Sequence, residues 1–369
     1  MKRKPLWLKW VWCAIPAVIA ILLYLILPHF PRVAEYGFTR AIFRVIGLPL
    51  EWLMSVFPFS VTEAVVISAA PALLLLLAVW IARIIKSPAR GKTAERGVRF
   101  VAWCVSLAML LYMVMHGANY DRLSAAELLA LPDRVYTAED LYSVTADLAQ
   151  KASAAREKLP EDENGCAALT VTQEELLLLA NDCYRPLQER YPFMITGVWQ
   201  VKSVALSHLW SYTGFTGVYC PWLGESSINT DVPVYEFGHT ATHEIAHTMG
   251  FAKENEANFL GWLACAESGQ PDYVYSGHLQ AYIYCGNALY KADKELWRQA
   301  ASNCSEGVWR DLKNRNTYWK QFEGEVQESS QKFNDSFIKA NGVASGTLSY
   351  NQMVELMLRW YDQQGFFGR

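Results

Sequence analysis

Three long apolar runs constrain the fold of this chain more than any other feature. They contain no charged residue and cover residues 10–28, 64–82 and 100–115. A helix rises about 1.5 Å per residue, so about twenty residues cross a hydrocarbon core about 30 Å thick. We therefore predict three transmembrane helices at about 10–28, 64–82 and 100–116. The third run is short, and a buried core helix is the alternative interpretation there.

The charges divide the chain at the same place. Residues 1–116 contain 13 Lys and Arg against 4 Asp and Glu, a net charge of +9, whereas residues 117–369 contain 20 against 32, a net charge of −12. Basic segments are expected beside anionic lipid, and acidic segments in solvent. We therefore predict a membrane domain at 1–116 and a second domain at 117–369.

The loops predict the orientation. Four basic residues precede the first run, and the loop between the second and third runs carries six against one Glu. Because Lys and Arg are enriched in cytoplasmic loops, we predict a multi-pass cell-membrane protein with a cytoplasmic N-terminus and residues 117–369 outside the cytoplasm. The first run is longer than the apolar core of a signal peptide, so we expect a retained anchor. Residues 41–54 are predicted to lie at the interface with their apolar side in lipid.

The cysteines leave two interpretations open. Two lie in the apolar runs, and six lie in the second domain: Cys166, Cys183, Cys220, Cys265, Cys285 and Cys304. An even number in an oxidising compartment permits disulfides, and Cys265 and Cys285 fall on consecutive predicted helices. Free buried thiols are the alternative, because Cys is among the most buried residue types.

The second domain contains the motif His243-Glu244-Ile245-Ala246-His247. Residues four apart on a helix lie one above the other, so both imidazoles point into one volume. Two imidazoles are half of a catalytic zinc site, and Glu244 is placed to take a proton from a zinc-activated water. The uncharged neighbours Ala241, Ile245 and Ala246 suit a helix with one buried face. Gly250 is expected to end that helix.

A catalytic zinc site needs a third protein ligand. The candidates are Glu254 and Glu256, which lie about 200° apart around a helix axis, so only one can face the ion. We expect Glu254 to interact with the first-turn amides of its own helix, and we predict Glu256 as the ligand. The metzincin pattern needs a third His six residues after the second, and that position is Lys253.

Four stretches of the chain resemble a family of bacterial membrane proteins known as domain of unknown function 3810. They are Gly-Ala-Asn-Tyr-Asp-Arg at 117–122, Thr-Gly-Phe-Thr-Gly-Val-Tyr-Cys-Pro-Trp-Leu-Gly-Glu at 213–225, the zinc motif through Asn258, and Ser-Gly-Thr-Leu-Ser-Tyr at 345–350. The resemblance covers most of the chain and implies a gluzincin-like, and hence zincin-like, peptidase fold. The Glu-Ala-Asn step at 256–258 also looks like the metal-ligand helix of ImmA/IrrE-type peptidases.

The rest of the second domain is predicted to be mainly helical with a small β-sheet, an α+β fold. Helical spacing and capping signals predict helices at 121–132, 138–159, 172–184, 273–289, within 291–340, and at 350–361. Aromatic and β-branched residues punctuated by Gly predict one or two strands within 198–231. Glu225 and Asn229 in this segment are expected to act as caps or supports or to lie in an ordinary loop.

Several further residues are candidates for binding substrate. Gly217, Val218 and Tyr219 are proposed to form an edge strand that binds the substrate backbone by β-augmentation, with a plain hairpin as the alternative. Tyr275 and His278 are candidates for stabilising the oxyanion, with core positions as the alternative. His239 precedes His243 by one helical turn, and we interpret it as a solvent-side histidine.

Together these features predict a membrane-anchored zinc metallopeptidase that binds one Zn²⁺ through His243, His247 and Glu256. Glu244 would act as the general base in peptide hydrolysis outside the cytoplasm. The expected partners are a peptide or protein substrate and the lipid bilayer, and no nucleic acid. The alternative is a non-catalytic zinc-binding membrane sensor or scaffold, for which His239 would be the fourth ligand.

Overall fold

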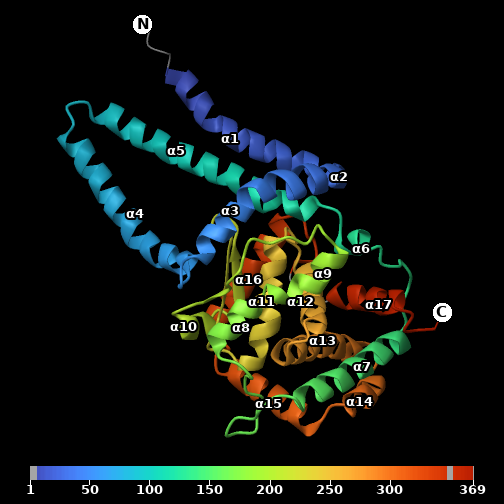
Figure 1. The fold of residues 1–369 in the computed structure, drawn as a ribbon. Coiled ribbons are helices and arrows are strands. Elements are labelled where there is room, and N and C mark those ends of the chain that lie inside the picture. The colour runs from blue at the N-terminus through green and yellow to red at the C-terminus, as the bar shows by residue number, and fades with distance from the viewer. Residues whose placement is uncertain (1–5, 347–351, 369) are drawn as a thin grey trace.

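The computed structural model describes residues 6–346 and 352–368 (Figure 1). It is 71% helical, with one small three-stranded sheet. The prediction of a mainly helical fold with a small sheet is therefore confirmed. The basic residues at positions 2–4, the segment Thr347–Tyr350 and the predicted start of the last helix at Tyr350 lie outside the described residues.

Three helices near the N-terminus are long and apolar enough to cross a membrane. They are α1 (Leu6–Ile26), α4 (Val61–Lys86) and α5 (Arg90–Met115). The third apolar run lies within a 26-residue helix, so its own short length does not limit the span. Figure 1 shows α1 and α5 side by side, while α4 diverges from them. The Ala17 amide of α1 donates to Ser106 Oγ of α5 at 2.8 Å.

The loop between α1 and α4 is itself helical and amphipathic. It contains η1 (Leu27–His29), α2 (Pro31–Val33), the π-helix η2 (Ala34–Phe43) and α3 (Arg44–Ser55). On α3, Arg44 and Glu51 are buried against the second domain, whereas Val45 and Trp52 are 75% and 61% exposed. This two-sided pattern is the one that the predicted interfacial segment requires.

Buried charged groups connect this loop to the second domain. Arg122 donates to both carboxylate oxygens of Glu35, at 2.7 and 3.1 Å, and to the Met249 carbonyl at 3.0 Å. Arg44 donates to the same Met249 carbonyl at 3.2 Å. Cations are stabilised at a helix C-terminus, and Met249 is the C-cap of the helix that carries the zinc motif.

Helix α4 and the segment that contains the sheet exchange buried carboxylates. The buried carboxylate of Glu225 accepts from the amides of Val61 and Thr62, the first two residues of α4, at 2.9 and 2.6 Å. In return, Glu63 of α4 accepts from the amides of Ala205 and Leu206 at 2.8 and 2.7 Å. Glu225 therefore caps a helix N-terminus, whose free amides favour an anion, and does not lie in an ordinary loop.

The remaining helices form the second domain. They are η3 (Gly117–Asp121), α6 (Ala125–Leu128), α7 (Ala138–Arg156), α8 (Gln173–Leu179), η4 (Asp182–Tyr184), α9 (Arg185–Arg190), α10 (Ser207–Ser211), η5 (Val234–Glu236), α11 (Phe237–Thr248), α12 (Glu254–Glu267), α13 (Pro271–Ala292), α14 (Lys294–Ala301), α15 (Glu306–Lys320), α16 (Glu325–Ala340) and α17 (Met353–Gln363). The capping box expected at Thr172 is present, and Ser124, where a helix cap is expected, also forms one. Helix α6 is shorter than expected because Leu131 precedes Pro132, which disfavours helical backbone.

The sheet has the strand order β1-β3-β2. Its strands are β1 (Lys202–Ser203), β2 (Gly217–Cys220) and β3 (Glu225–Ile228). Strand β3 is parallel to β1 and antiparallel to β2, with Val218 opposite Ser227. The segment predicted to contain strands therefore contains all three, and β2 lies at an edge, directly before Pro221.

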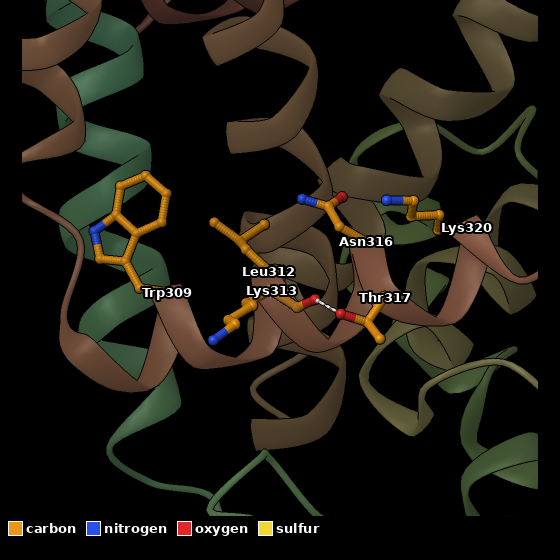
Figure 2. Close-up of a pocket in the computed structure, with 6 residues that line it drawn as sticks. All are labelled: Trp309, Leu312, Lys313, Asn316, Thr317 and Lys320. Carbon is orange, nitrogen blue, oxygen red and sulfur yellow. Dashed lines mark hydrogen bonds between the residues drawn. The ribbon is translucent and has the colours of Figure 1, made fainter.

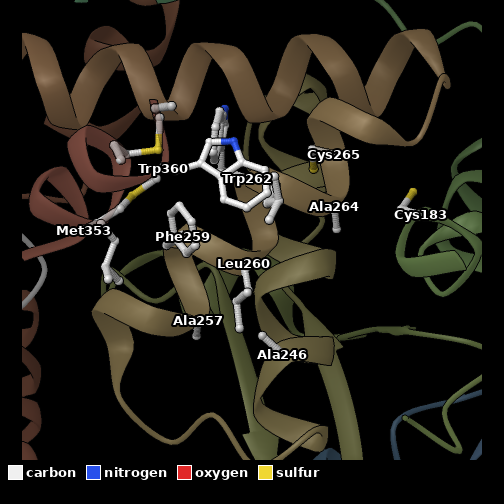
Figure 3. Packing of buried hydrophobic residues seen from close by; sticks show 14 of the residues in the cluster. Cys183, Ala246, Ala257, Phe259, Leu260, Trp262, Ala264, Cys265, Met353 and Trp360 are labelled. Carbon is white, nitrogen blue, oxygen red and sulfur yellow. The ribbon is translucent and has the colours of Figure 1, made fainter. Parts of the chain in front are cut away.

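The main core lies between α11, α12, α13, α7 and α17. In Figure 3 the labelled side chains come from α11 (Ala246), α12 (Ala257, Phe259, Leu260, Trp262, Ala264, Cys265), α17 (Met353, Trp360) and Cys183. All eight cysteines lie in the described part of the chain, and all are free thiols. Cys265 and Cys285 are fully buried and unpaired, so the structure has the buried thiols rather than the disulfide.

Candidate metal centre

Helix α11 positions the two histidines of the motif. Its apolar face is fully buried at Ala241, Ile245 and Ala246, which fixes the helix against the core. The opposite face brings the rings of His243 and His247 to 4.8 Å between centroids. The helix ends as predicted at Gly250, whose φ of +82° is a conformation that suits glycine.

Glu254 completes the group. The Nε2 atoms of His243 and His247 lie 3.1 Å apart, and the Glu254 carboxylate lies 3.2 Å from the first and 3.8 Å from the second. All three ligand atoms lie within 4.8 Å of one another. Tetrahedral bonds of about 2.0–2.1 Å from zinc to nitrogen would place two nitrogens about 3.3 Å apart. The spacing therefore fits one divalent ion.

The hydrogen bond and the burial of His247 suit a metal ligand, whereas His243 is held by the charge of Glu254. The Nδ1–H of His247 donates to the Phe251 carbonyl at 2.7 Å, which leaves the Nε2 lone pair directed at the group. Burial lowers the pKa of His247 to about 4, so this ring is neutral at pH 7, as a ligand must be. Burial also acts to lower the pKa of His243, but the hydrogen bond and charge of Glu254 outweigh it and raise that pKa.

The structure does not bring Glu256 to the histidines, and its predicted place in the ligand group is wrong. Glu256 is buried, and its carboxylate accepts from the Ala125 amide at the start of α6, at 3.1 Å. Glu254 is the first residue of α12 and projects back to α11. Only one of the two acids faces the histidines, as the geometry requires. The prediction assumed that Glu254 would accept from the first-turn amides of its own helix. Instead Glu254 faces the histidines, and Glu256 accepts from the Ala125 amide at the start of α6.

Glu244 lies at the same centre. It is 4% exposed, and burial raises the pKa of its carboxyl to about 8, with His243 acting to lower this pKa and Glu254 to raise it. A Cβ atom at residue 217 would collide with the Glu244 carboxylate, so only glycine lets β2 approach so closely. Ser226 of β3 donates to the Glu244 carbonyl at 3.1 Å and ties the sheet to α11.

Strand β2 presents an open edge beside these groups. The Thr216 carbonyl accepts from the Asn229 amide at 2.8 Å, and in the register of β2 and β3 these two residues are directly opposite. Bonded and non-bonded pairs alternate along antiparallel strands. The backbone N–H and C=O groups of Gly217 and Tyr219 therefore point away from β3. Both residues line the cleft described below.

His239 differs from its prediction as a solvent-side residue. It is 5% exposed and lines the cleft, and its Nε2 atom lies 3.1 Å from the Asn258 carbonyl oxygen.

The oxyanion candidates are not brought to the site. The Tyr275 hydroxyl donates to Asp311 at 2.5 Å within a separate buried cluster, and His278 is buried away from the cleft lining. Both are core positions, as in the alternative interpretation.

A cleft of about 1010 Å³ surrounds the centre. Besides α11 and β2, its lining includes Tyr112 of α5, His116 at the α5 C-cap, Tyr120 of η3, Gln280 and Tyr284 of α13, Arg315 of α15, and Phe333 and Phe337 of α16. Sequence reasoning missed these residues. The family-like stretch at 117–122 begins directly after α5 and could have pointed to the end of this helix as part of the site. No sequence feature pointed to α16.

A second hollow of about 330 Å³ lies along another face of α15 (Figure 2). One helix supplies its whole lining, Trp309, Leu312, Lys313, Asn316, Thr317 and Lys320. The Thr317 hydroxyl donates to the Lys313 carbonyl at 2.9 Å, as is common for helical Thr. None of these residues lines the cleft around His243, so the larger cleft is the candidate site.

The fold and site define a mainly helical protein with three candidate membrane-spanning helices and a buried His-His-Glu group. The chain belongs to a protein family of unknown function, DUF3810, whose model matches residues 38–358. That match includes α3, α4, α5, the sheet and the His-His-Glu group. Comparisons with curated proteins and with solved structures gave no match.

Proposed function

We propose that this protein is a membrane-anchored, zinc-dependent metallopeptidase with a zincin-like catalytic domain, which hydrolyses peptide bonds outside the cytoplasm. One observation carries the proposal: His243, His247 and Glu254 converge within 4.8 Å, and Glu244 and an open strand edge lie beside them. Two imidazoles and one carboxylate are the ligand set of zinc peptidases, which leave a position for water.

The residues of this chain have separate roles in the proposed reaction. A zinc ion held by His243, His247 and Glu254 would supply the Lewis acid that polarises the scissile carbonyl and acidifies a water molecule. Glu244 takes the proton of the attacking water and returns it to the leaving amine. The outward backbone groups of Gly217 and Tyr219 hold the substrate as an added strand, which aligns the scissile bond with Glu244.

The test is a substitution of the general base. Glu244→Gln keeps the shape of the side chain and removes the base, so zinc content should be unchanged while cleavage of casein and of a randomised peptide library falls by about 10²–10⁴-fold. The full-length protein, purified in detergent, serves for both measurements. Equal cleavage by the parent and the variant would refute the proposal.

The alternative of a structural zinc site in a sensor or scaffold requires a fourth protein ligand. Among the described residues, the metal-binding group contains three. His239, the candidate fourth ligand, has its Nε2 atom beside the Asn258 carbonyl. Zinc analysis of His239→Ala separates the two functions, because a closed structural site would lose its metal and an open catalytic site would keep it.

A further inference from the structure

The candidate site lies at the end of a membrane-spanning helix. The third candidate span covers Arg90–Asp121, and Tyr112, His116 and Tyr120 from its last turns line the cleft. The His116 ring lies 6.1 Å from the Tyr219 ring, which in turn stacks on His247 at 6.2 Å. Two ring contacts therefore separate the end of the span from a metal ligand.

These distances set how far a substrate must reach. An extended chain advances about 3.3–3.6 Å per residue, so about four residues cover the two ring contacts. A polypeptide that leaves the bilayer beside α5 would have its peptide bonds at the histidines almost at once. A soluble substrate would have to enter the same narrow space between the protein and the lipid surface.

An aromatic group marks the membrane end of the cleft. Tyr112 contacts Trp222 at 5.9 Å and Phe337 at 6.2 Å, and Phe337 stacks on His116 at 6.4 Å. This aromatic collar, formed by Tyr112, His116, Trp222 and Phe337, joins α5, the turn after β2, and α16. Two of its members are Tyr and Trp, the aromatic residues that are enriched at the membrane–water interface.

The open strand edge points in the same direction. Its Tyr219 end touches His116 at the end of α5, and its Gly217 end lies against Glu244. A peptide added along β2 therefore runs from the aromatic collar to the general base. The strand that would bind substrate leads from the membrane surface to the site of cleavage.

We propose that the substrates of this site are membrane-tethered polypeptides, cut in the segment that directly follows or precedes their transmembrane helix. This inference rests on the proposed peptidase function and names its substrate class. It gives the three spans a role beyond anchoring, because α5 supplies one wall of the cleft. The cut position is then set by distance from the bilayer, within about four residues of extended chain.

The test uses the full-length protein and Glu244→Gln reconstituted in phosphatidylcholine vesicles. The probe is one randomised peptide segment in two forms: free in solution, and fused to a Leu-Ala transmembrane helix through Gly-Ser spacers of increasing length. Mass spectrometry locates each cut. Tethering alone can strengthen binding by about 10²–10⁴-fold without any new contact. The spacer series therefore distinguishes cleavage at a fixed distance from the membrane from a general gain due to tethering.

The expected result is Glu244-dependent cleavage that is fastest with the shortest spacers, at a point that keeps its distance from the membrane as the spacer grows. Cuts that stay with the peptide sequence at every spacer length, or equal rates for free and tethered forms, would overturn the inference and leave the peptidase proposal standing. Cleavage of neither form by the zinc-loaded parent would overturn both.

A matched pair of substitutions on α16 tests whether substrate contacts this wall of the cleft, and neither substitution changes the metal centre. Phe333 is 73% exposed and lines the cleft, whereas Val326 is 56% exposed and does not. Phe333→Ser should slow cleavage of the tethered probe, by about 5–30-fold if one buried aromatic contact worth 1–2 kcal/mol is lost. Val326→Ser should leave the rate unchanged. Equal rates for all three proteins on the tethered probe would contradict this placement of the substrate.

Discussion

The choice between Glu254 and Glu256 gives the sharpest test of the metal centre. The two acids lie two residues apart, and each is replaced by Gln, which keeps the size of the side chain. Glu254 reaches both histidines, at 3.2 and 3.8 Å, whereas Glu256 bonds the Ala125 amide at 3.1 Å. The two variants should therefore fail in different assays.

The expected magnitudes follow from these contacts. Loss of a partner that only orients a metal ligand costs about 10–100-fold in metal affinity, so loss of a direct ligand in Glu254→Gln should cost at least about 100-fold. Glu256→Gln keeps an acceptor for the Ala125 amide and removes a buried charge, so zinc affinity should be unchanged. Its stability should change by about 1–3 kcal/mol, the range for a hydrogen bond to a charged group.

The assay is zinc content by mass spectrometry together with competition against a chelator, on both variants and the parent in detergent. Thermal unfolding of the metal-free proteins reports stability separately. Retention of zinc by Glu254→Gln together with its loss from Glu256→Gln would refute the ligand set. That result would make Glu256 the third ligand, as the sequence predicted.

Three further perturbations test other parts of the structure. Gly217→Ala should lower kcat/KM on a cleaved peptide by about 10²-fold, because its Cβ displaces the general base, whereas Gly91→Ala, with open space around it, should have no effect. Burial raises the pKa of Glu51 to about 7, so the folded state holds this proton more tightly than the unfolded chain does. Stability should therefore fall by up to about 3 kcal/mol as pH rises from about 4.5 to about 7, and Glu51→Gln should abolish that slope in thermal unfolding across this range. Arg122→Met should cost about 1.5–3 kcal/mol in detergent unfolding, because the fully buried Glu35 loses its bidentate partner and keeps only Arg40 at 2.5 Å, and a cost below 1 kcal/mol would contradict this account.

Local signals in the sequence predicted much of the fold. Apolar runs, the cap at Ser124, the capping box at Thr172 and the glycine at 250 are short-range features, and the structure places helices, caps and a helix end there. The spacing of His243 and His247 was equally local, because a helix alone brings residues four apart together.

Long-range contacts could not be predicted in the same way. Glu254 and Glu256 differ only in which distant group each meets, and the Ala125 amide that binds Glu256 lies 131 residues earlier in the chain. The oxyanion candidates failed for the same reason, since Tyr275 is held by Asp311 from α15. His239 gave no sign of burial in its neighbours, because the Asn258 carbonyl beside it belongs to the next helix.

The carboxylates exchanged between α4 and the segment that contains the sheet impose an order of assembly during synthesis. Helix α4 precedes residues 202–228 in the chain, so its first amides are synthesised before the carboxylate that caps them. The sheet is then completed against a helix that already exists. A fragment starting at residue 117 would leave Glu225 buried without the Val61 and Thr62 amides, so this hydrophilic half depends on α4 to satisfy a buried carboxylate.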